Sequence, residues 1–137
     1  IDYEETTVLD MFGGTGSISL EFASRGCPEI TLIELNSLNY TFIRKTIAEL
    51  NIDNIRTLRT DTFKYLSSCR SRFDLIFADP PYALKELPTI PDLIFERGLL
   101  KDDGVFVFEH GKDHDFTSHP HFVEHRSYGS VNFSIFR

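Results

Sequence analysis

Residues 8–17, which read VLDMFGGTGS, decide the fold class of this 137-residue chain. The short apolar run at Thr7–Leu9 predicts a strand, and the glycines at 13, 14 and 16 predict a tight loop. Ser17 is a natural N-cap for a helix that reaches Arg25, and Gly26 stands where a left-handed helix end is expected. A strand, a glycine loop and a helix in this order are typical of α/β proteins with a parallel sheet.

Apolar runs and helical periods alternate along the rest of the chain in the same manner. Further strands are expected at 30–33, 55–59, 73–78 and 105–109, helices at 37–50, 63–68 and 87–97, and a terminal hairpin at 122–127 and 131–136. We therefore predict one α/β domain over residues 1–137, a Rossmann-like three-layer sandwich. Its seven-stranded sheet is expected to be mostly parallel, with an antiparallel terminal strand.

Acidic residues stand at the predicted carboxyl ends of four strands: Asp10, Glu34, Asp61 and Asp79. Ligands of open α/β sheets bind at this edge. An acidic residue about twenty positions after the glycine loop commonly accepts hydrogen bonds from ribose hydroxyls, and Glu34 fits that place. Asp61 is placed either to contact an adenine amine or to cap the next helix, and the two roles are compatible.

Two features of the loop argue against a dinucleotide. Ser19 stands where the third glycine of the dinucleotide fingerprint belongs. Asp10 adds negative charge where a pyrophosphate would lie, which favours a ligand with a positive end, such as the amino group of S-adenosylmethionine.

The tetrapeptide Asp79-Pro80-Pro81-Tyr82 follows directly on the apolar run Phe73–Ala78. The prolines prevent a helix or a ladder from continuing. The Asp79 carboxylate and a backbone carbonyl near Pro80 can together accept the hydrogens of an exocyclic amine, which frees its lone pair for methylation. Tyr82 can stack on the base, a contact worth about 1–3 kcal/mol. Positioning and polarisation then suffice, without a strong general base.

The first motif, the Glu21 and Ser24-Arg25-Gly26 segment, the tetrapeptide and Tyr128-Gly129-Ser130 together resemble class I S-adenosylmethionine-dependent methyltransferases. Within that class the chain is similar to the RsmD type, bacterial enzymes that methylate the N2 amine of a guanine in small-subunit ribosomal RNA. The resemblance covers nearly the whole chain. It departs from the family's pattern at Gly13, where an alanine is expected, a change that should be harmless.

The resemblance implies S-adenosyl-L-methionine as the cofactor and ribosomal RNA, or the assembling small ribosomal subunit, as the partner. Asp79 and Pro80 would hold the guanine amine, with Pro81 completing the motif and Tyr82 against the base. Asp10, Gly14 and Gly16 would line the methionine end of the cofactor, Glu34 would bind its ribose, and Asp61 with Thr62 would flank its adenine. The remaining predicted cofactor-binding residues are Phe12, Gly13, Thr15 and Leu35.

The composition sets further expectations. A net charge of −7 is unusual for a nucleic-acid binder, and the chain begins at Ile1 without methionine. We therefore expect that the basic N-terminal segment typical of the family is missing. Two cysteines without metal-ligand spacing suit a cytoplasmic protein. We expect exposed loop histidines and no metal site, no membrane segment, and a monomer.

Four alternatives, of three classes, remain beside RNA guanine N2 methylation. An adenine-N6 methyltransferase acting on DNA or RNA uses a similar tetrapeptide, and a protein-glutamine methyltransferase uses one that resembles Asn-Pro-Pro-Tyr. An NAD-dependent oxidoreductase domain is disfavoured by Asp10 and Ser19. A fragment that binds S-adenosylmethionine without turnover is the third class.

Overall fold

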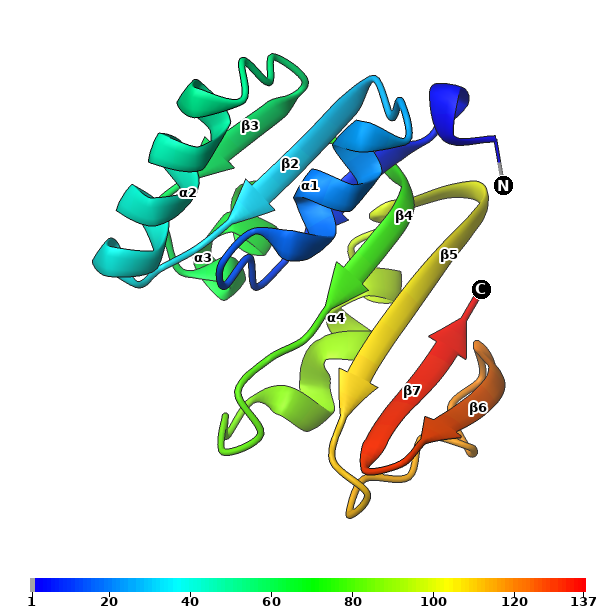
Figure 1. Ribbon diagram of the computed structural model, residues 1–137. Helices are drawn as coiled ribbons and strands as arrows, with labels where there is room; N and C mark the ends of the chain where they lie inside the picture. The colour runs from blue at the N-terminus through cyan, green and yellow to red at the C-terminus, as the bar shows by residue number, and fades with distance from the viewer. Residues whose placement is uncertain (1) are drawn as a thin grey trace. The chain divides into compact units, whose positions relative to one another are not determined.

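The computed structural model describes residues 2–137 and divides into two units (Figure 1). The N-terminal unit extends to Cys69, and the C-terminal unit runs from Arg70 to Arg137. No helix within residues 2–137 is long and apolar enough to cross a membrane.

The N-terminal unit is built on three parallel strands, β1 (Thr7–Asp10), β2 (Glu29–Ile33) and β3 (Ile55–Leu58), in the order β3-β2-β1. Val8 pairs with Ile30, and Ile30 pairs with Ile55. Central strands of parallel sheets are covered on both faces, so they need apolar side chains at consecutive positions. Val8, Leu9 and Ile30 are accordingly buried.

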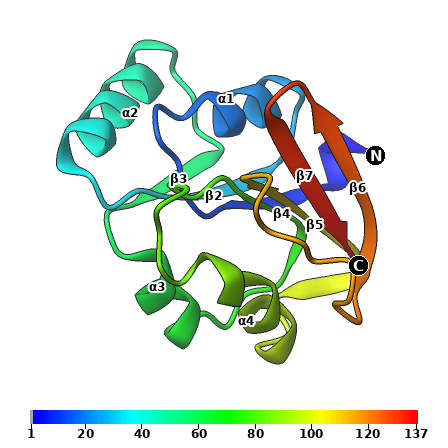
Figure 2. The same ribbon diagram turned by 90° about the horizontal axis from the view of Figure 1, so that it is seen from below.

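Three α-helices flank these strands: α1 (Ser17–Ser24), α2 (Ser37–Glu49) and α3 (Thr62–Ser68), and a short 3-10 helix, η1 (Tyr3–Glu5), precedes β1. Figure 2 shows α1 and α2 on one face of the strands and α3 on the other. The predicted N-cap of α1 is wrong by one residue. Gly16, at φ 86°, is the N-cap and Ser17 is the first helical residue, because the chain enters the helix through a left-handed conformation that favours glycine. Gly26 is left-handed, as predicted.

The C-terminal unit contains β4 (Phe73–Ala78), β5 (Leu100–His110), β6 (Phe122–Tyr128) and β7 (Val131–Phe136). β4 and β5 are parallel, whereas β7 runs antiparallel to both β5 and β6, which gives the order β4-β5-β7-β6. Its core is aromatic: the rings of Phe106 and Phe108, and those of Phe106 and Phe136, stack with centroids 5.3 Å apart. Such pairs add to the burial of their large apolar area.

Two predicted elements of this unit differ from the structure. The helix expected over 87–97 is a 3-10 turn, η2 (Leu87–Thr89), followed by α4 (Ile90–Glu96), because Pro88 and Pro91 each favour the start of a helix over its interior. β5 begins at Leu100, five residues before its predicted start. The ladder is irregular there, since Phe73 pairs with Leu100 but Leu75 pairs with Val105.

The expectation that the histidines are exposed in loops holds in full only for His121. His114 and His119 are half-buried, His125 is exposed but lies within β6, and His110 departs most. This residue ends β5 and is fully buried. Its Nδ1 lies 2.8 Å from the carbonyl oxygen of Gly111, and its Nε2 lies 2.7 Å from the Ser134 hydroxyl. A carbonyl can only accept, so Nδ1 carries the proton and Nε2 accepts from Ser134. Among residues 2–137, no group of three or more His, Cys, Asp or Glu residues is placed to hold a metal ion.

Candidate active site

The glycine loop of the N-terminal unit is attached to the end of β2 by two backbone donors. The Gly13 amide donates to the Ile33 carbonyl at 2.8 Å, and the Gly14 amide donates to Oε1 of Glu34 at 2.7 Å. Gly14 adopts φ 58°, a backbone conformation that residues with a Cβ rarely take. The loop is therefore held in one shape by β2 and by Glu34.

Glu34 connects the glycine loop to the ends of β2 and β3. Its Oε2 accepts from the Asn36 amide at 2.8 Å, and its own amide donates to the Leu58 carbonyl at the end of β3. A carboxylate oxygen can accept more than one hydrogen bond, so both oxygens retain capacity for ribose hydroxyls. A Cβ at Gly14 would meet no atom within 4 Å, so the glycine loop is open on that side.

Asp10 ends β1 and is buried. The hydroxyl of Ser19, which occupies the position of the missing third glycine, donates to Oδ2 of Asp10 at 2.8 Å. A buried carboxylate needs such charge-assisted bonds, since desolvation otherwise disfavours its charged form. Ser19 thus has a structural role as the anchor of Asp10.

The remaining residues predicted to bind cofactor lie in the same unit. Asp61 caps α3, because its Oδ1 accepts from the amides of Phe63 and Lys64 at 2.9 and 3.1 Å. The cap uses one carboxylate oxygen, so capping and a second contact through Oδ2 remain compatible. Thr62 is buried as the first residue of α3, whereas the Leu35 side chain is 60 % exposed. Phe12 and Thr15 lie in the glycine loop, with Phe12 half-buried and Thr15 exposed.

Gly13 departs from the family's alanine for a visible reason. A Cβ added at this position would lie 2.5 Å from Cδ2 and 2.8 Å from Cγ of Leu32, which is fully buried. Such distances require Leu32 to move within a packed core. Glycine in place of the expected alanine is thus compatible with this packing, in which Gly13 and Leu32 are matched to one another.

The predicted catalytic tetrapeptide lies in the C-terminal unit. Ala78 of β4 pairs with Phe108 of β5, so the next residues, Asp79 and Glu109, are neighbours at the ends of these strands. Their side chains share a hydrogen bond. Loss of solvent around the carboxyl raises the pKa of Asp79, while the hydrogen bond with Glu109 acts in the opposite direction.

Glu109 is more strongly perturbed. Partial burial, the charge of Asp79 and the hydrogen bond with Asp79 raise the pKa of Glu109 to about 7, although a hydrogen bond with Tyr82 lowers it. Two adjacent carboxyls cannot both ionise easily, so one of them keeps a proton. The shared hydrogen bond raises the pKa of Glu109 and lowers that of Asp79, which favours Glu109 as the carboxyl that keeps the proton.

Tyr82 and the prolines complete this group. Pro80 is buried and Pro81 is exposed, and the Leu84 amide donates to the Pro81 carbonyl at 2.9 Å in the turn that follows. The Tyr82 side chain is 51 % exposed, with its hydroxyl bonded to Glu109. A fixed hydroxyl and an exposed ring suit a stacking surface for a planar ligand.

The sequence reasoning did not identify Glu109. The same rule that located Asp79, an acidic residue at the carboxyl end of a buried strand, applies to Glu109 in the segment predicted to span 105–109. The signal was therefore present, but the proximity of the two side chains depends on the register of β4 and β5, which sequence alone does not specify.

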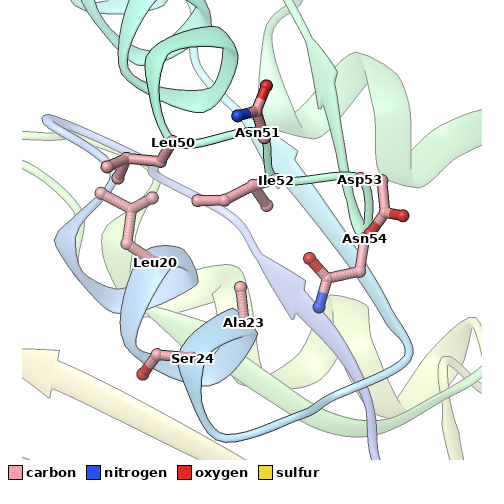
Figure 3. A pocket seen from close by; sticks show the side chains of 8 residues that line it. All are labelled: Leu20, Ala23, Ser24, Leu50, Asn51, Ile52, Asp53 and Asn54. Carbon is pink, nitrogen blue, oxygen red and sulfur yellow. The ribbon is translucent and has the colours of Figure 1, made fainter.

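A cavity of about 360 Å³ lies elsewhere in the N-terminal unit (Figure 3). Leu20, Ala23 and Ser24 of α1 line it on one side and residues 50–54 on the other. None of the predicted cofactor-binding residues lines this cavity, which therefore does not mark the candidate site.

Comparison with known proteins identifies the class. A protein from Haemophilus influenzae superposes with a TM-score of 0.88 at 21% identity, covering 98% of this chain and 87% of that one. The methyltransferase PaMTH1 of Podospora anserina, solved with S-adenosylhomocysteine, gives a TM-score of 0.81 at 14% identity, over 96% and 72% of the two chains. The fold is thus the Rossmann-like α/β fold of class I methyltransferases, with seven strands and an antiparallel β7, as predicted.

The family follows from the sequence matches. Ribosomal RNA small subunit methyltransferase D of Buchnera aphidicola is 32% identical over 105 residues, which cover 76% of this chain and 55% of that protein. The family model described as conserved hypothetical protein 95 matches residues 2–137. The chain belongs to this family, the RsmD-type S-adenosylmethionine-dependent methyltransferases. It spans about half the length of the ribosomal RNA methyltransferases that it matches.

The cofactor of this family is S-adenosyl-L-methionine. The residues of the N-terminal unit fit such a group. A left-handed glycine loop gives close access to backbone amides, and Glu34 presents a carboxylate that the Gly14 and Asn36 amides hold in place.

Proposed function

We propose that this chain transfers a methyl group from S-adenosyl-L-methionine to the exocyclic N2 amine of a guanine in small-subunit ribosomal RNA. The observation that carries the proposal is Asp79, a carboxylate held at the end of β4 by Glu109, beside the exposed ring of Tyr82. The printed name of the Buchnera relative, a ribosomal RNA small subunit methyltransferase, supports RNA as the substrate.

The mechanism relies on positioning by the protein. S-adenosylmethionine supplies an electrophilic methyl group when bound. Asp79 accepts a hydrogen bond from the guanine amine, and the carbonyl of Pro80 accepts the second hydrogen, which draws the nitrogen lone pair out of conjugation. Tyr82 stacks on the base and fixes its plane. Because the amine is oriented and polarised in advance, the protein lowers the barrier without a strong base. The N–CH3 bond would form as the S–CH3 bond breaks, S-adenosylhomocysteine would be the leaving group, and the proton lost by the amine would pass to the Asp79 carboxylate that accepts its hydrogen bond.

The N-terminal unit would provide the cofactor contacts. Asp10, Gly14 and Gly16 would line the methionine end and Glu34 would bind the ribose hydroxyls. Asp61 and Thr62 would flank the adenine, with Oδ2 of Asp61 accepting from its amine. The rest of the surface would consist of Phe12, Gly13, Thr15 and Leu35.

On this proposal residues 1–137 form the methyltransferase domain, acting as a monomer in the cytoplasm on ribosomal RNA or the assembling small subunit. The net charge of −7 makes it a weak binder of RNA by itself.

The first test is calorimetric titration with S-adenosylhomocysteine, with NAD as the control. Binding of the former alone is expected, and binding of NAD would contradict the cofactor assignment. The second test offers labelled S-adenosylmethionine with small-subunit RNA and with assembling subunits, and maps the product by mass spectrometry. Label at guanine N2 is expected; label at adenine N6 would support the main alternative, and binding without transfer would indicate a fragment that lacks turnover.

A further inference from the structure

The Glu109 side chain contacts two residues of the predicted catalytic tetrapeptide, Asp79 and Tyr82. Glu109 is the last residue but one of β5 and lies beside Asp79, and it is half-buried and hydrogen-bonded to both Asp79 and Tyr82. On its other side its register partner is Phe133 of β7, which is uncharged. Among residues 2–137, the titratable groups that act on Glu109 are Asp79, directly after β4, and Tyr82 in the turn that follows.

The hydrogen bonds of the Asp79 and Glu109 carboxyls depend on which of the two carries a proton. Tyr82 donates its hydroxyl hydrogen to Glu109. If both carboxyls were ionised, neither could donate to the other and their charges would repel at hydrogen-bonding distance. With one proton on Glu109, its hydroxyl donates to one oxygen of Asp79, and the other oxygen of Asp79 remains charged.

We propose that Glu109 is a positioning residue whose protonated carboxyl donates to Asp79 and so holds one charged Asp79 oxygen toward the substrate amine. This inference rests on the proposed function and names a residue that neither the sequence reasoning nor the family match assigns. Tyr82, Glu109 and Asp79 then form one chain of hydrogen bonds. These hydrogen bonds connect the ring of Tyr82, which stacks on the base, to Asp79, which accepts from the amine. The plane of the base and the amine acceptor are therefore oriented together.

The state of Glu109 depends on pH in the neutral range. As pH rises through about 7, Glu109 loses its proton, the donor disappears and two charges face each other. Methyl transfer should therefore decline as pH rises above about 7.

The first experiment measures the proton directly and needs no substrate. The full chain is labelled with ¹³C at the carboxyls of Glu and Asp, and each resonance is followed with pH. Glu109 should titrate near 7, and Asp79→Asn, which removes the neighbouring charge, should lower that midpoint towards that of an ordinary glutamate. A Glu109 that titrates with the other glutamates in the wild-type chain would overturn the inference.

The second experiment separates a donor from a base by methyl-transfer kinetics. Glu109→Gln keeps a hydrogen-bond donor but cannot titrate, so kcat/KM should stay close to wild type at pH 6 and lose its alkaline decline. Glu109→Ala removes the donor, and a loss on the order of tenfold is expected, the effect of about 1.4 kcal/mol. Glu124→Gln, at a surface ion pair with Arg126 in the same unit, is the matched control.

The outcomes distinguish this inference from the proposed function. A Glu109→Gln variant as impaired as Glu109→Ala, or one that keeps the alkaline decline, would overturn the positioning role. If wild-type chain methylates no RNA, the proposed function fails by itself. The carboxyl titration still supports or overturns the shared proton in that case.

Discussion

The packing of the glycine loop on β2 leaves no room for a methyl group at Gly13. We predict that Gly13→Ala lowers the free energy of unfolding by about 1–3 kcal/mol, the usual effect of overpacking a core. The reason is the approach of the new Cβ to within 2.5 Å of Cδ2 of Leu32. Urea denaturation measures the change.

The double variant Gly13→Ala, Leu32→Val gives the control, because valine lacks the reach of the leucine side chain. If the clash is the cause, the two changes together should destabilise less than the sum of the single changes. Strict additivity would show that the loss at Gly13 arises from something other than contact with Leu32.

Glu34 combines a structural and a binding role in one carboxylate. Glu34→Ala removes the acceptors of the Gly14 and Asn36 amides, so we predict lower stability and an S-adenosylhomocysteine affinity reduced at least about tenfold, equivalent to 1.4 kcal/mol. Calorimetric titration measures the affinity. Glu29→Ala, exposed at the opposite end of β2, is the control and should bind normally. Unchanged affinity in Glu34→Ala would remove the ribose assignment.

At the scale of the element, α3 depends on its cap. Asp61→Ala should lower the free energy of unfolding by about 0.5–2 kcal/mol, whereas Asp61→Asn retains a capping oxygen and should be nearly neutral. The pair of variants separates the two roles of this residue, because asparagine caps the helix but lacks the charge for an adenine amine. Thermal unfolding and S-adenosylhomocysteine affinity are measured on both. Equal affinity in Asp61→Asn and wild type would leave Asp61 with the cap alone.

Elements could be predicted from sequence where one local signal dominated. β4 and β7 have their predicted bounds, since each is a continuous apolar or alternating run with clear turn residues around it. The segment 87–97 was predicted as one helix with Pro91 near its start and Gly98 past its end, but Pro88 and Pro91 divide it into η2 and α4. The early start of β5 was missed because Lys101–Gly104 has the composition of a turn yet lies within an irregular ladder.

The residues of the candidate site that lie at the carboxyl ends of strands could be predicted from the sequence. Asp10, Glu34 and Asp79 were identified because carboxyl ends of parallel strands are where such folds bind ligands. The Ser19 contact with Asp10 and the Glu109 contact with Asp79 were not predicted. Each needs the spatial relation of two segments, 9 residues apart in the first case and on neighbouring strands in the second.

At the scale of the whole molecule, two adjacent residues of β5 give the stability opposite dependences on pH. Burial lowers the pKa of His110 from 6.5, so its contribution is present above pH 6.5 and is lost as pH falls. Glu109 acts in the reverse sense. Its pKa rises from 4.5 to about 7 on folding, so the folded state binds more protons between these values and stability falls as pH rises through them.

Glu109→Gln removes only the second of these dependences. We predict that the variant gains stability relative to wild type as pH rises from 5 to 8, because the wild type must ionise a carboxyl beside Asp79 and the variant need not. Urea denaturation at both pH values measures the difference, and Glu124→Gln should show the same difference from wild type at each. A Glu109→Gln difference that does not change with pH would mean that Glu109 is already ionised at pH 5. The proton would then not be shared, and removal of the charge repulsion would stabilise the variant equally at both pH values.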